Sequence, residues 1–300
     1  MINQKINLHT HSSFCDGKNT AEEMVQSAIE RGLTVLGFSG HCMYPLNPEF
    51  YKPVDHVWHM PSDRIADYAA EVRRLAQKYQ DKIRILLGFE ADFFCSARYG
   101  NAIPDKNIYS SFAPDYLIGS VHFINASDKE FGFFTVDNKT ECVKEALNSF
   151  YKKNDGTIDG KAAVCDYFEA ERQMLVRGNF EIMGHPDLIR LRNTGLHFFN
   201  ENDEWYKEQL RLTAKAAATA GVVAEINTGA VARGLMSELY PSLQFLEYLK
   251  EAGVPVCINT DSHKTDTIDF GLDSAREYAK KAGYDELSYP VDGKLVHIKI

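Results

Sequence analysis

The chain has 300 residues, of which 44% are hydrophobic, and it carries a formal net charge of −9. That hydrophobic share is ordinary for a globular protein with a large core, and barrels built of strands and helices reach about 200–250 residues as one domain. The negative charge argues against nucleic-acid binding, which normally uses a basic surface. We therefore expect a single domain over residues 1–300 that binds no nucleic acid.

The N-terminal sequence MINQKINLHT has neither the apolar segment nor the cleavage site of a signal peptide. No run approaches the roughly 20 apolar residues that a membrane helix needs. The 6 cysteines are scattered without paired spacing, which is typical of reduced thiols. These features predict a cytoplasmic protein with no membrane partner.

Short apolar runs rich in Ile, Val, Leu and Phe recur along the chain. Such near-continuous runs are typical of parallel strands that are buried on both faces. The predicted strands are Ile6–His9, Thr34–Ser39, Ile83–Glu90, Tyr116–His122, Glu181–His185, Val222–Asn227 and Pro255–Thr260.

Amphipathic stretches separate these runs. Thr20 and Glu23 have the spacing of a capping box, and Gly32 follows the end of the apolar pattern. Other helices are predicted from Pro61 and over Thr140–Tyr151, Lys161–Arg177, Asp203–Ala220, Ser242–Ala252 and Asp273–Ala282. The alternation predicts a parallel sheet of βαβ units, and its seven strands favour a barrel, although counting alone leaves a doubly wound sheet open.

Three irregular stretches are longer than simple connections: Cys42–Pro61, Asn101–Pro114 and Ala126–Asn138. Loops of this length in a compact domain are more often functional than not. His56 and His59 lie in the first of them and are expected in a surface loop, with a lid that faces the substrate as the alternative.

Residue types that bind metals fall repeatedly at the ends of the apolar runs. His9 and His11 lie on the same side of a strand because side chains alternate with a period of two. One such histidine is more often a structural residue, but independent core histidines have no reason to share one end of every strand. The carboxyl ends of barrel strands converge on one face, where the active site lies. The nine candidate ligands are His9, His11, Asp16, His41, Glu90, His122, His185, Asp261 and His263.

Catalytic zinc-type sites use about three protein ligands for each ion, so nine candidates indicate up to three divalent ions. The segments LHTHSSFCDG, GFSGH, GFEADF, GSVHF, GHPD and NTDSH resemble the motif series of the PHP (polymerase and histidinol phosphatase) superfamily, from His9 to His263. They are most similar to its monofunctional histidinol-phosphate phosphatases. The resemblance implies a single PHP-type domain that folds as a distorted (β/α)7 TIM-like barrel with three metal ions.

The resemblance also implies how the ligands are divided. One ion takes His9, His11, Glu90 and Asp261; a second shares Glu90 and adds His122 and His185; a third takes Asp16, His41 and His263. Many relatives have a histidine where Asp16 stands. A hard carboxylate at that position leaves manganese or iron open beside zinc, the expected metal.

These features predict a metal-dependent phosphatase, and the resemblance implies that it hydrolyses L-histidinol phosphate to L-histidinol and phosphate in histidine biosynthesis. A hydroxide that bridges two ions would attack phosphorus, because bound cations lower the pKa of water toward about 7. Among Arg190, Arg192 and Arg233, which follow strand ends, we select Arg192 and Arg233 as phosphate-binding residues together with His41. The predicted catalytic residues are Asp16, His41, Glu90 and Asp261, and the sequence does not decide which of Asp16, His41 and Asp261 is the general acid.

Three alternatives remain open. The first is a phosphoesterase of the same superfamily that acts on another small phosphate monoester or a nucleotide. The second is a non-catalytic metal-binding PHP module, which predicts missing ligands. The third is an amidohydrolase, which would normally show a metal-bridging lysine at a strand end. The sequence does not indicate the oligomeric state.

Overall fold

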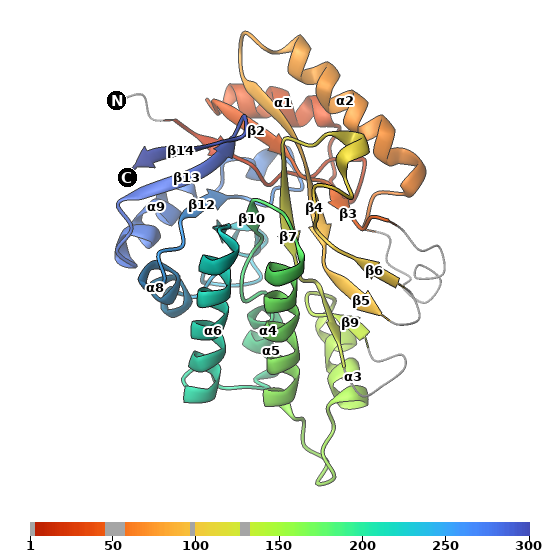
Figure 1. The fold of residues 1–300 in the computed structure, drawn as a ribbon, viewed down its shortest axis with the longest axis vertical. Coiled ribbons are helices and arrows are strands. Elements are labelled where there is room, and N and C mark those ends of the chain that lie inside the picture. Colours follow the sequence, from red (N-terminus) through yellow and green to blue (C-terminus); the bar gives the residue numbers. More distant parts are fainter. Residues whose placement is uncertain (1–3, 46–57, 97–99, 127–132) are drawn as a thin grey trace.

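The computed structural model describes residues 4–45, 58–96, 100–126 and 133–300. Its centre is an eight-stranded parallel sheet (Figure 1). Seven strands neighbour one another in chain order: β1 (Ile6–Asn7), β2 (Val35–Phe38), β4 (Arg84–Asp92), β7 (Tyr116–Ser120), β10 (Ile182–Met183), β11 (Val223–Asn227) and β12 (Val256–Asn259). The short strand β3 (His41–Cys42) pairs with the far end of β4.

Contacts between the first and last strands nearly close this sheet into a barrel. A parallel bridge joins Thr10 to Ser262, and the His11 amide donates to the Ser262 carbonyl at 2.9 Å. The Asn259 side chain accepts a bond from the Leu8 amide at 2.7 Å. The predicted seven-stranded barrel is therefore confirmed, and the open doubly wound sheet is excluded.

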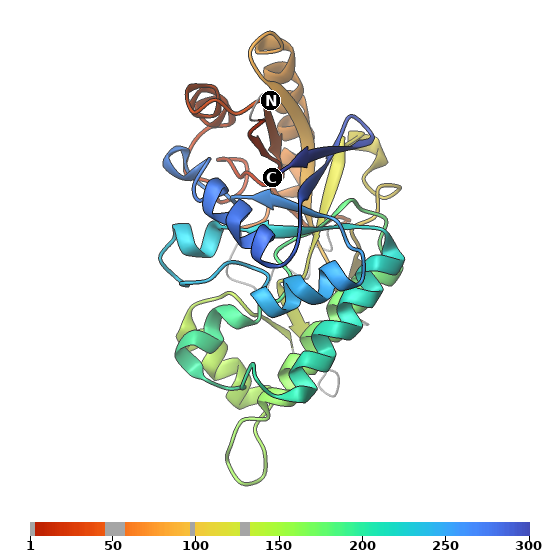
Figure 2. The same ribbon diagram turned by 90° about the vertical axis from the view of Figure 1, so that its left-hand side faces the viewer.

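Helices surround the sheet in two groups. In Figure 1, α1 and α2 lie above it, while α4 and α6 run below it; Figure 2 shows the same layers from the side. The helices are α1 (Ala21–Glu30), α2 (Ile65–Lys78), α3 (Thr140–Phe150), α4 (Gly160–Arg177), α5 (Arg190–Leu196), α6 (Glu204–Ala220), α7 (Gly229–Ala232), α8 (Leu243–Glu251) and α9 (Leu272–Lys281). Short 3₁₀ turns cover Ser62–Arg64, Ser110–Phe112 and Thr265–Thr267.

Five parts of the fold were not predicted from the sequence. Helix α7 follows the end of β11 almost directly, and α5 lies a few residues after the end of β10. Three small hairpins also occur, and the third lies against β12 near the C-terminus. The hairpins are β5 (Phe94–Ser96) with β6 (Gly100–Ala102), β8 (Phe123–Asn125) with β9 (Phe133–Thr135), and β13 (Glu286–Val291) with β14 (Lys294–Lys299). Much of the predicted loop Cys42–Pro61 lies outside the described residues.

Except for β4, the barrel strands are shorter than predicted. Strand β1 ends at Asn7 and β10 at Met183, so His9 and His185 follow their strands instead of ending them. Glu90 is the exception and lies inside the long strand β4. The side chains still meet at one end of the barrel because all these strands run in parallel.

The barrel interior is filled around one tyrosine. Tyr116 is fully buried, and its hydroxyl donates to the backbone carbonyls of Leu8 and Phe38. A Cβ atom on Gly37 or Gly88 would lie 2.3 or 2.4 Å from this side chain. Only glycine therefore allows the ring to occupy this space and tie β1, β2 and β4 together.

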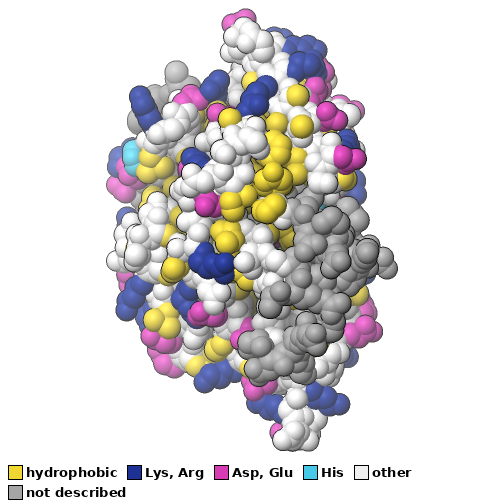
Figure 3. Space-filling model, turned by 45° about the vertical axis from the view of Figure 1, so that its right-hand side comes forward, with side chains coloured by type: hydrophobic (Ala, Val, Ile, Leu, Met, Phe, Trp, Pro, Cys, Tyr) yellow, Lys and Arg dark blue, Asp and Glu magenta, His cyan; other side chains and the backbone are white. Residues whose placement is uncertain are grey.

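Charges of both signs are spread over the face in Figure 3, next to one group of hydrophobic side chains. The large exposed hydrophobic residues of the described chain are Val176, Leu212, Leu235, Phe270 and Leu295, which are far apart in the sequence. Among the described residues, no helix combines the length and the apolar character needed to cross a membrane.

Candidate metal centre

The first group of ligand-type side chains joins β1 to β4. His9, His11 and Glu90 are buried, and their ligand atoms lie within 4.8 Å of one another. The Nε2 atoms of both histidines face Glu90 Oε2, at 3.1 Å for His9 and 3.5 Å for His11. Asp261 approaches from the end of β12, with its Oδ1 3.1 Å from His11 Nε2. The structure thus brings together the four residues expected at one ion.

The second group lies on the other oxygen of Glu90. His185 Nε2 is 2.7 Å and His122 Nε2 is 3.5 Å from Glu90 Oε1. Ser120 also donates to this oxygen at 2.8 Å. Each oxygen of Glu90 therefore faces a different set of histidines, which is the arrangement that a carboxylate shared by two ions requires.

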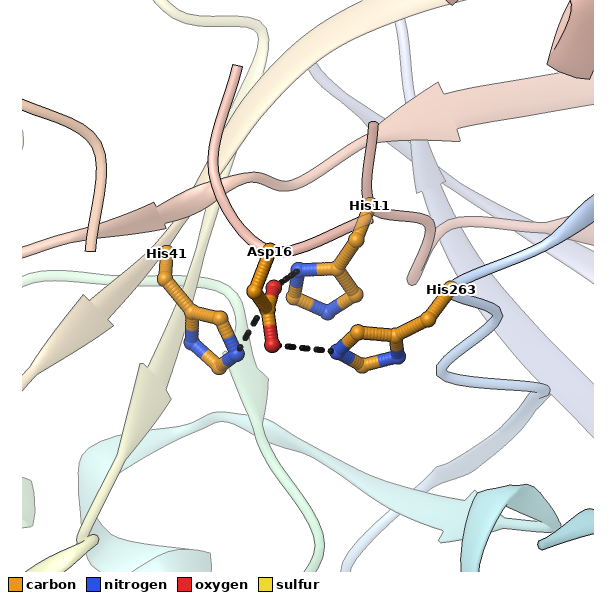
Figure 4. A group of neighbouring side chains, drawn as sticks. All are labelled: His11, Asp16, His41 and His263. Carbon is orange, nitrogen blue, oxygen red and sulfur yellow. Dashed lines mark ion pairs between the residues drawn. The ribbon is translucent and has the colours of Figure 1, made fainter. Parts of the chain in front are cut away.

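The third group surrounds Asp16, as Figure 4 shows. Its carboxylate lies 3.2 Å from His263 Nε2 and 3.8 Å from both His11 Nδ1 and His41 Nε2. Asp16 lies in a loop whose ends are held by the Gly17 amide on the Ser12 carbonyl and the Lys18 amide on the His263 carbonyl. This loop carries Asp16 to the expected ligands.

Two contacts differ from the expected division of the ligands among three ions. His11 contacts both the first and the third groups, and His41 Nδ1 lies 2.8 Å from Glu90 Oε2 besides facing Asp16. The three groups therefore form one continuous cluster, because the strand ends are closer together than a sequence can show.

Asp92 is a buried residue at this cluster that the sequence analysis missed. Its carboxylate accepts from His122 Nδ1 at 2.5 Å and also contacts His59 Nε2. Such a carboxylate fixes the ring and leaves the other nitrogen free to bind a metal. The sequence could have revealed Asp92, since it lies two residues after Glu90 on the same strand and so faces the same side.

His59 is only 2% exposed, so its expected place in a surface loop is wrong. Its ring stacks on Phe123, and Trp58 beside it stacks on the same phenylalanine. These contacts bury the imidazole next to Asp92. His56 lies outside the described residues.

Glu225 orients His9 in the way that Asp92 orients His122. It is fully buried in β11, and its Oε1 lies 2.8 Å from His9 Nδ1, which leaves His9 Nε2 directed at Glu90. Asn227 and Asn259 each donate to this carboxylate at 2.9 Å. A glutamate inside a buried apolar strand is the signal that could have revealed it, because a buried charge needs partners.

The side chains fit a set of divalent cations. Several buried ligand atoms have no hydrogen-bond partner within the described chain, which is rare for buried polar groups. They are His9 Nε2, His11 Nε2, Asp16 Oδ1, His41 Nδ1, Glu90 Oε2 and His185 Nδ1. Imidazole nitrogens and carboxylate oxygens are ligands for zinc, manganese and iron.

The pKa shifts show strong coupling between these groups. Burial opposes ionisation of Glu90, but His41, His9 and His122 hold its pKa well below the usual value. Burial lowers the pKa of His41, yet Glu90 and Asp16 raise it to about 9. Burial together with the nearby His263 and His41 lowers the pKa of His11 to about 3. In the metal-free protein at neutral pH, His11 is thus neutral, whereas His41 holds a proton.

Two candidate ligands have strained backbones. His185 has a φ of 31° and Asp261 a φ of 48°, values that residues other than glycine rarely adopt. Such conformations persist only where the surrounding structure holds them, and they are concentrated at functional sites. The barrel therefore imposes the positions of these side chains.

A cavity of about 450 Å³ opens above the cluster. Its lining includes His41, Arg192 and Arg233, the residues expected to bind phosphate. Arg233 lies beside Asp261, with 3.1 Å between Nη2 and Oδ2. Arg192 also lines the cavity, and it donates to the backbone carbonyls of Asn138 and Asp137 at 2.5 and 2.6 Å. Arg190 instead is buried and forms ion pairs of 2.7 Å with Glu201 and Glu238.

The model of the PHP domain family matches residues 7–229. The chain belongs to the PHP family. A probable histidinol-phosphatase of Schizosaccharomyces pombe is 28% identical over 94% of this chain and 88% of its own length. The histidinol-phosphatase of Lactococcus lactis is also 28% identical, over 95% and 94% of the two chains.

Two solved structures share the fold. A protein of Listeria monocytogenes, described as a candidate histidinol phosphatase, superposes with a TM-score of 0.74 at 23% identity over 90% of this chain and 99% of its own. The histidinol phosphate phosphatase of Lactococcus lactis, solved with zinc, L-histidinol and phosphate, gives a TM-score of 0.67 at 20% identity over 98% and 99%. These likenesses establish the PHP-type barrel.

Proposed function

We propose that this protein is a metal-dependent phosphatase that hydrolyses L-histidinol phosphate to L-histidinol and phosphate in histidine biosynthesis. The observation that carries the proposal is the convergence of all nine candidate ligands on one end of the barrel, beneath a cavity with Arg233 at its wall. Two relatives that match at least 88% of their own length bear the name histidinol-phosphatase. The substrate rests on these names.

We infer that the cluster holds three divalent ions, with zinc as the expected metal and manganese or iron as alternatives. His9, His11, Glu90 and Asp261 would hold one ion. Glu90, His122 and His185 would hold the second, and Asp16, His41 and His263 the third. When bound, the ions lower the pKa of water and neutralise charge on the phosphoryl oxygens. Residues 1–300 form one domain that acts in the cytoplasm and binds neither nucleic acid nor membrane.

The protein side chains position the substrate. Arg233 has a planar guanidinium that suits a phosphate, and its ion pair with Asp261 directs it toward the cluster. Arg192 uses two of its nitrogens on backbone carbonyls, so it offers its remaining nitrogen to the phosphate from a fixed position. His41 lies at the mouth of the cluster and completes the phosphate-binding set.

The pKa shifts describe the three candidates for the general acid in the metal-free protein. Burial favours the neutral carboxyl groups of Asp16 and Asp261, but nearby histidines and Arg233 hold both pKa values well below normal. Neither carboxyl group therefore carries a proton at neutral pH. His41 has its pKa raised to about 9 in the metal-free protein, but an ion bound to this ring would displace the proton, so all three residues remain candidates for the general acid.

The test is phosphate release by the zinc-loaded protein from a panel of esters. L-histidinol phosphate should be hydrolysed with a far higher kcat/KM than AMP or p-nitrophenyl phosphate. Equal values would refute the substrate and favour a general phosphoesterase. No phosphate release from any ester, in protein shown to contain metal, would favour a non-catalytic PHP module.

A further inference from the structure

The cavity contains one carboxylate that belongs to none of the metal-ligand groups. Asp137 lines it directly after strand β9 and is half-buried. The other carboxylates of the cavity wall, Asp16, Glu90 and Asp261, all face candidate metal ligands. Within the described chain, the backbone carbonyl of Asp137 accepts a hydrogen bond from Arg192, while its carboxylate acts electrostatically on His122 and Arg233 and raises the pKa of each.

The backbone around Asp137 is held from both sides. The Val136 amide donates to the carbonyl of His122 at 2.9 Å, which ties this segment to a metal-ligand position. Arg192 donates to the carbonyls of Asp137 and Asn138 at 2.6 and 2.5 Å. The main chain of Asp137 is therefore held at the cavity wall, and its carboxylate lies near enough to Arg233 and His122 to raise their pKa values.

A carboxylate at this place is unfavourable for an ordinary phosphate ester. The ester brings negative charge into the same cavity, and two like charges at close range repel each other. The repulsion becomes attraction only if the substrate also carries a cation. L-histidinol phosphate does so, because an ammonium group sits on the carbon next to the ester-bearing carbon.

We propose that Asp137 binds the ammonium group of the substrate and selects phosphate monoesters that carry an amine beside the ester. This inference rests on the proposed function and deepens it. The same carboxylate attracts the amino ester and repels esters without a cation, which is how specificity is normally achieved. Arg192 acts on this selection through the backbone that it holds.

Two pairs of compounds test the inference on the zinc-loaded enzyme. The first pair is L-histidinol phosphate and its analogue without the amine, 3-(imidazol-4-yl)propyl phosphate. The second pair is ethanolamine phosphate and ethyl phosphate, used as substrates or competitive inhibitors. In Asp137→Asn, the preference for the amino compound in each pair should fall roughly 10–100-fold, mainly through KM or Ki, as expected for a hydrogen bond between charged groups.

Lys139→Ala is the matched control, since Lys139 is an exposed charged residue of the same cavity wall. It should change both members of a pair by the same factor. The zinc content and circular dichroism of Asp137→Asn must match those of the wild type, and Asp137→Glu should recover part of the preference. Equal losses for both members of each pair in Asp137→Asn would overturn the inference.

The two proposals fail in different ways. If the wild type hydrolyses L-histidinol phosphate no better than AMP, the proposed function fails, while the ethanolamine pair still tests Asp137. If the wild type prefers L-histidinol phosphate over AMP but handles its analogue without the amine equally well, the role of Asp137 fails and the proposed function stands.

Discussion

Glu90 is the residue on which the site depends most. It is fully buried, and its two oxygens face His9 and His41 on one side and His122 and His185 on the other. A glutamine at this position keeps the shape but loses the charge that balances these imidazoles and any bound ions. Among the described residues, no other side chain of the cluster contacts as many histidines.

We expect Glu90→Gln to lower kcat roughly 100-fold or more and to reduce the number of bound zinc ions, because a ligand to two ions is lost. Steady-state kinetics and metal analysis measure both effects. The control is Glu181→Gln, a half-buried glutamate at the opposite end of β10 that accepts from the Leu117 amide at 2.9 Å. Near-normal activity of Glu90→Gln would contradict the shared role.

Asp92 acts on the metal through His122. Asp92→Asn removes the charge that holds this ring, so zinc affinity should fall roughly 10–100-fold, as is typical for residues that orient a ligand. Competition with a fluorescent chelator measures the affinity. Asp115→Asn is a matched control, because Asp115 accepts from the Leu87 amide at 2.7 Å before strand β7, away from the cluster. Equal affinities of the two variants would refute the orienting role.

Zinc binding should depend on pH through the histidines. Burial lowers the pKa values of His41 and His122, but nearby carboxylates raise them to about 9 and about 10. Below these values the rings are protonated in the metal-free protein, and a metal must displace the protons. Apparent zinc affinity should therefore rise from pH 6 to pH 9. Calorimetry in buffers of different ionisation enthalpy should detect proton release at pH 7, and its absence would contradict the raised pKa values.

Among the secondary-structure elements, helix α1 shows how the sequence determines its own boundary. Thr20 and Glu23 form a capping box, in which Glu23 accepts from the Thr20 amide at 2.7 Å and Thr20 accepts from the Glu23 amide at 3.3 Å. The bonds satisfy amides that the first helical turn leaves without partners. Because all of these contacts are local, the residues alone predicted them.

Thr20→Ala should lower the free energy of unfolding by about 1 kcal/mol, the usual effect of losing such a cap. Urea denaturation measures this loss. Turnover should be unchanged, because the helix start contacts no residue of the cluster. A loss of activity without a loss of stability would show that the segment has another role.

At the scale of the whole molecule, the cluster connects strands from every part of the barrel. Its ligands come from segments near residues 9–16, 41, 90, 122, 185 and 261–263, so ions bound there link the first strand to the last. Ligands that bind only the folded state stabilise it by mass action. The buried atoms without hydrogen-bond partners make the metal-free barrel the less stable form.

Removal of the metals by a chelator should lower the melting temperature by roughly 5–10 °C, since free ions at about 100 times Kd contribute about 2.7 kcal/mol for one site. Scanning calorimetry with and without EDTA measures the change, and zinc added back should restore it. The decrease in melting temperature caused by EDTA should be smaller in Glu90→Gln. An unchanged melting temperature in protein shown to have lost its metal would refute the linking role.

The sequence by itself determined the strand order, the capping box and the nine candidate ligands. These features are local: a strand has a period of two, a cap spans four residues, and a ligand stands at the end of its own apolar run. Parallel strands then have to point those ends to the same side, so the convergence of the ligands followed from the pattern.

Only the tertiary structure decided which distant groups meet. It placed His11 between two groups, buried His59 against Asp92, put Glu225 behind His9, and placed Asp137 at the cavity wall. These contacts join segments that are far apart in the chain, and they depend on the register and closure of the barrel. No local pattern encodes a distance across the barrel, which is why the ligands could be predicted but the residues that orient them could not.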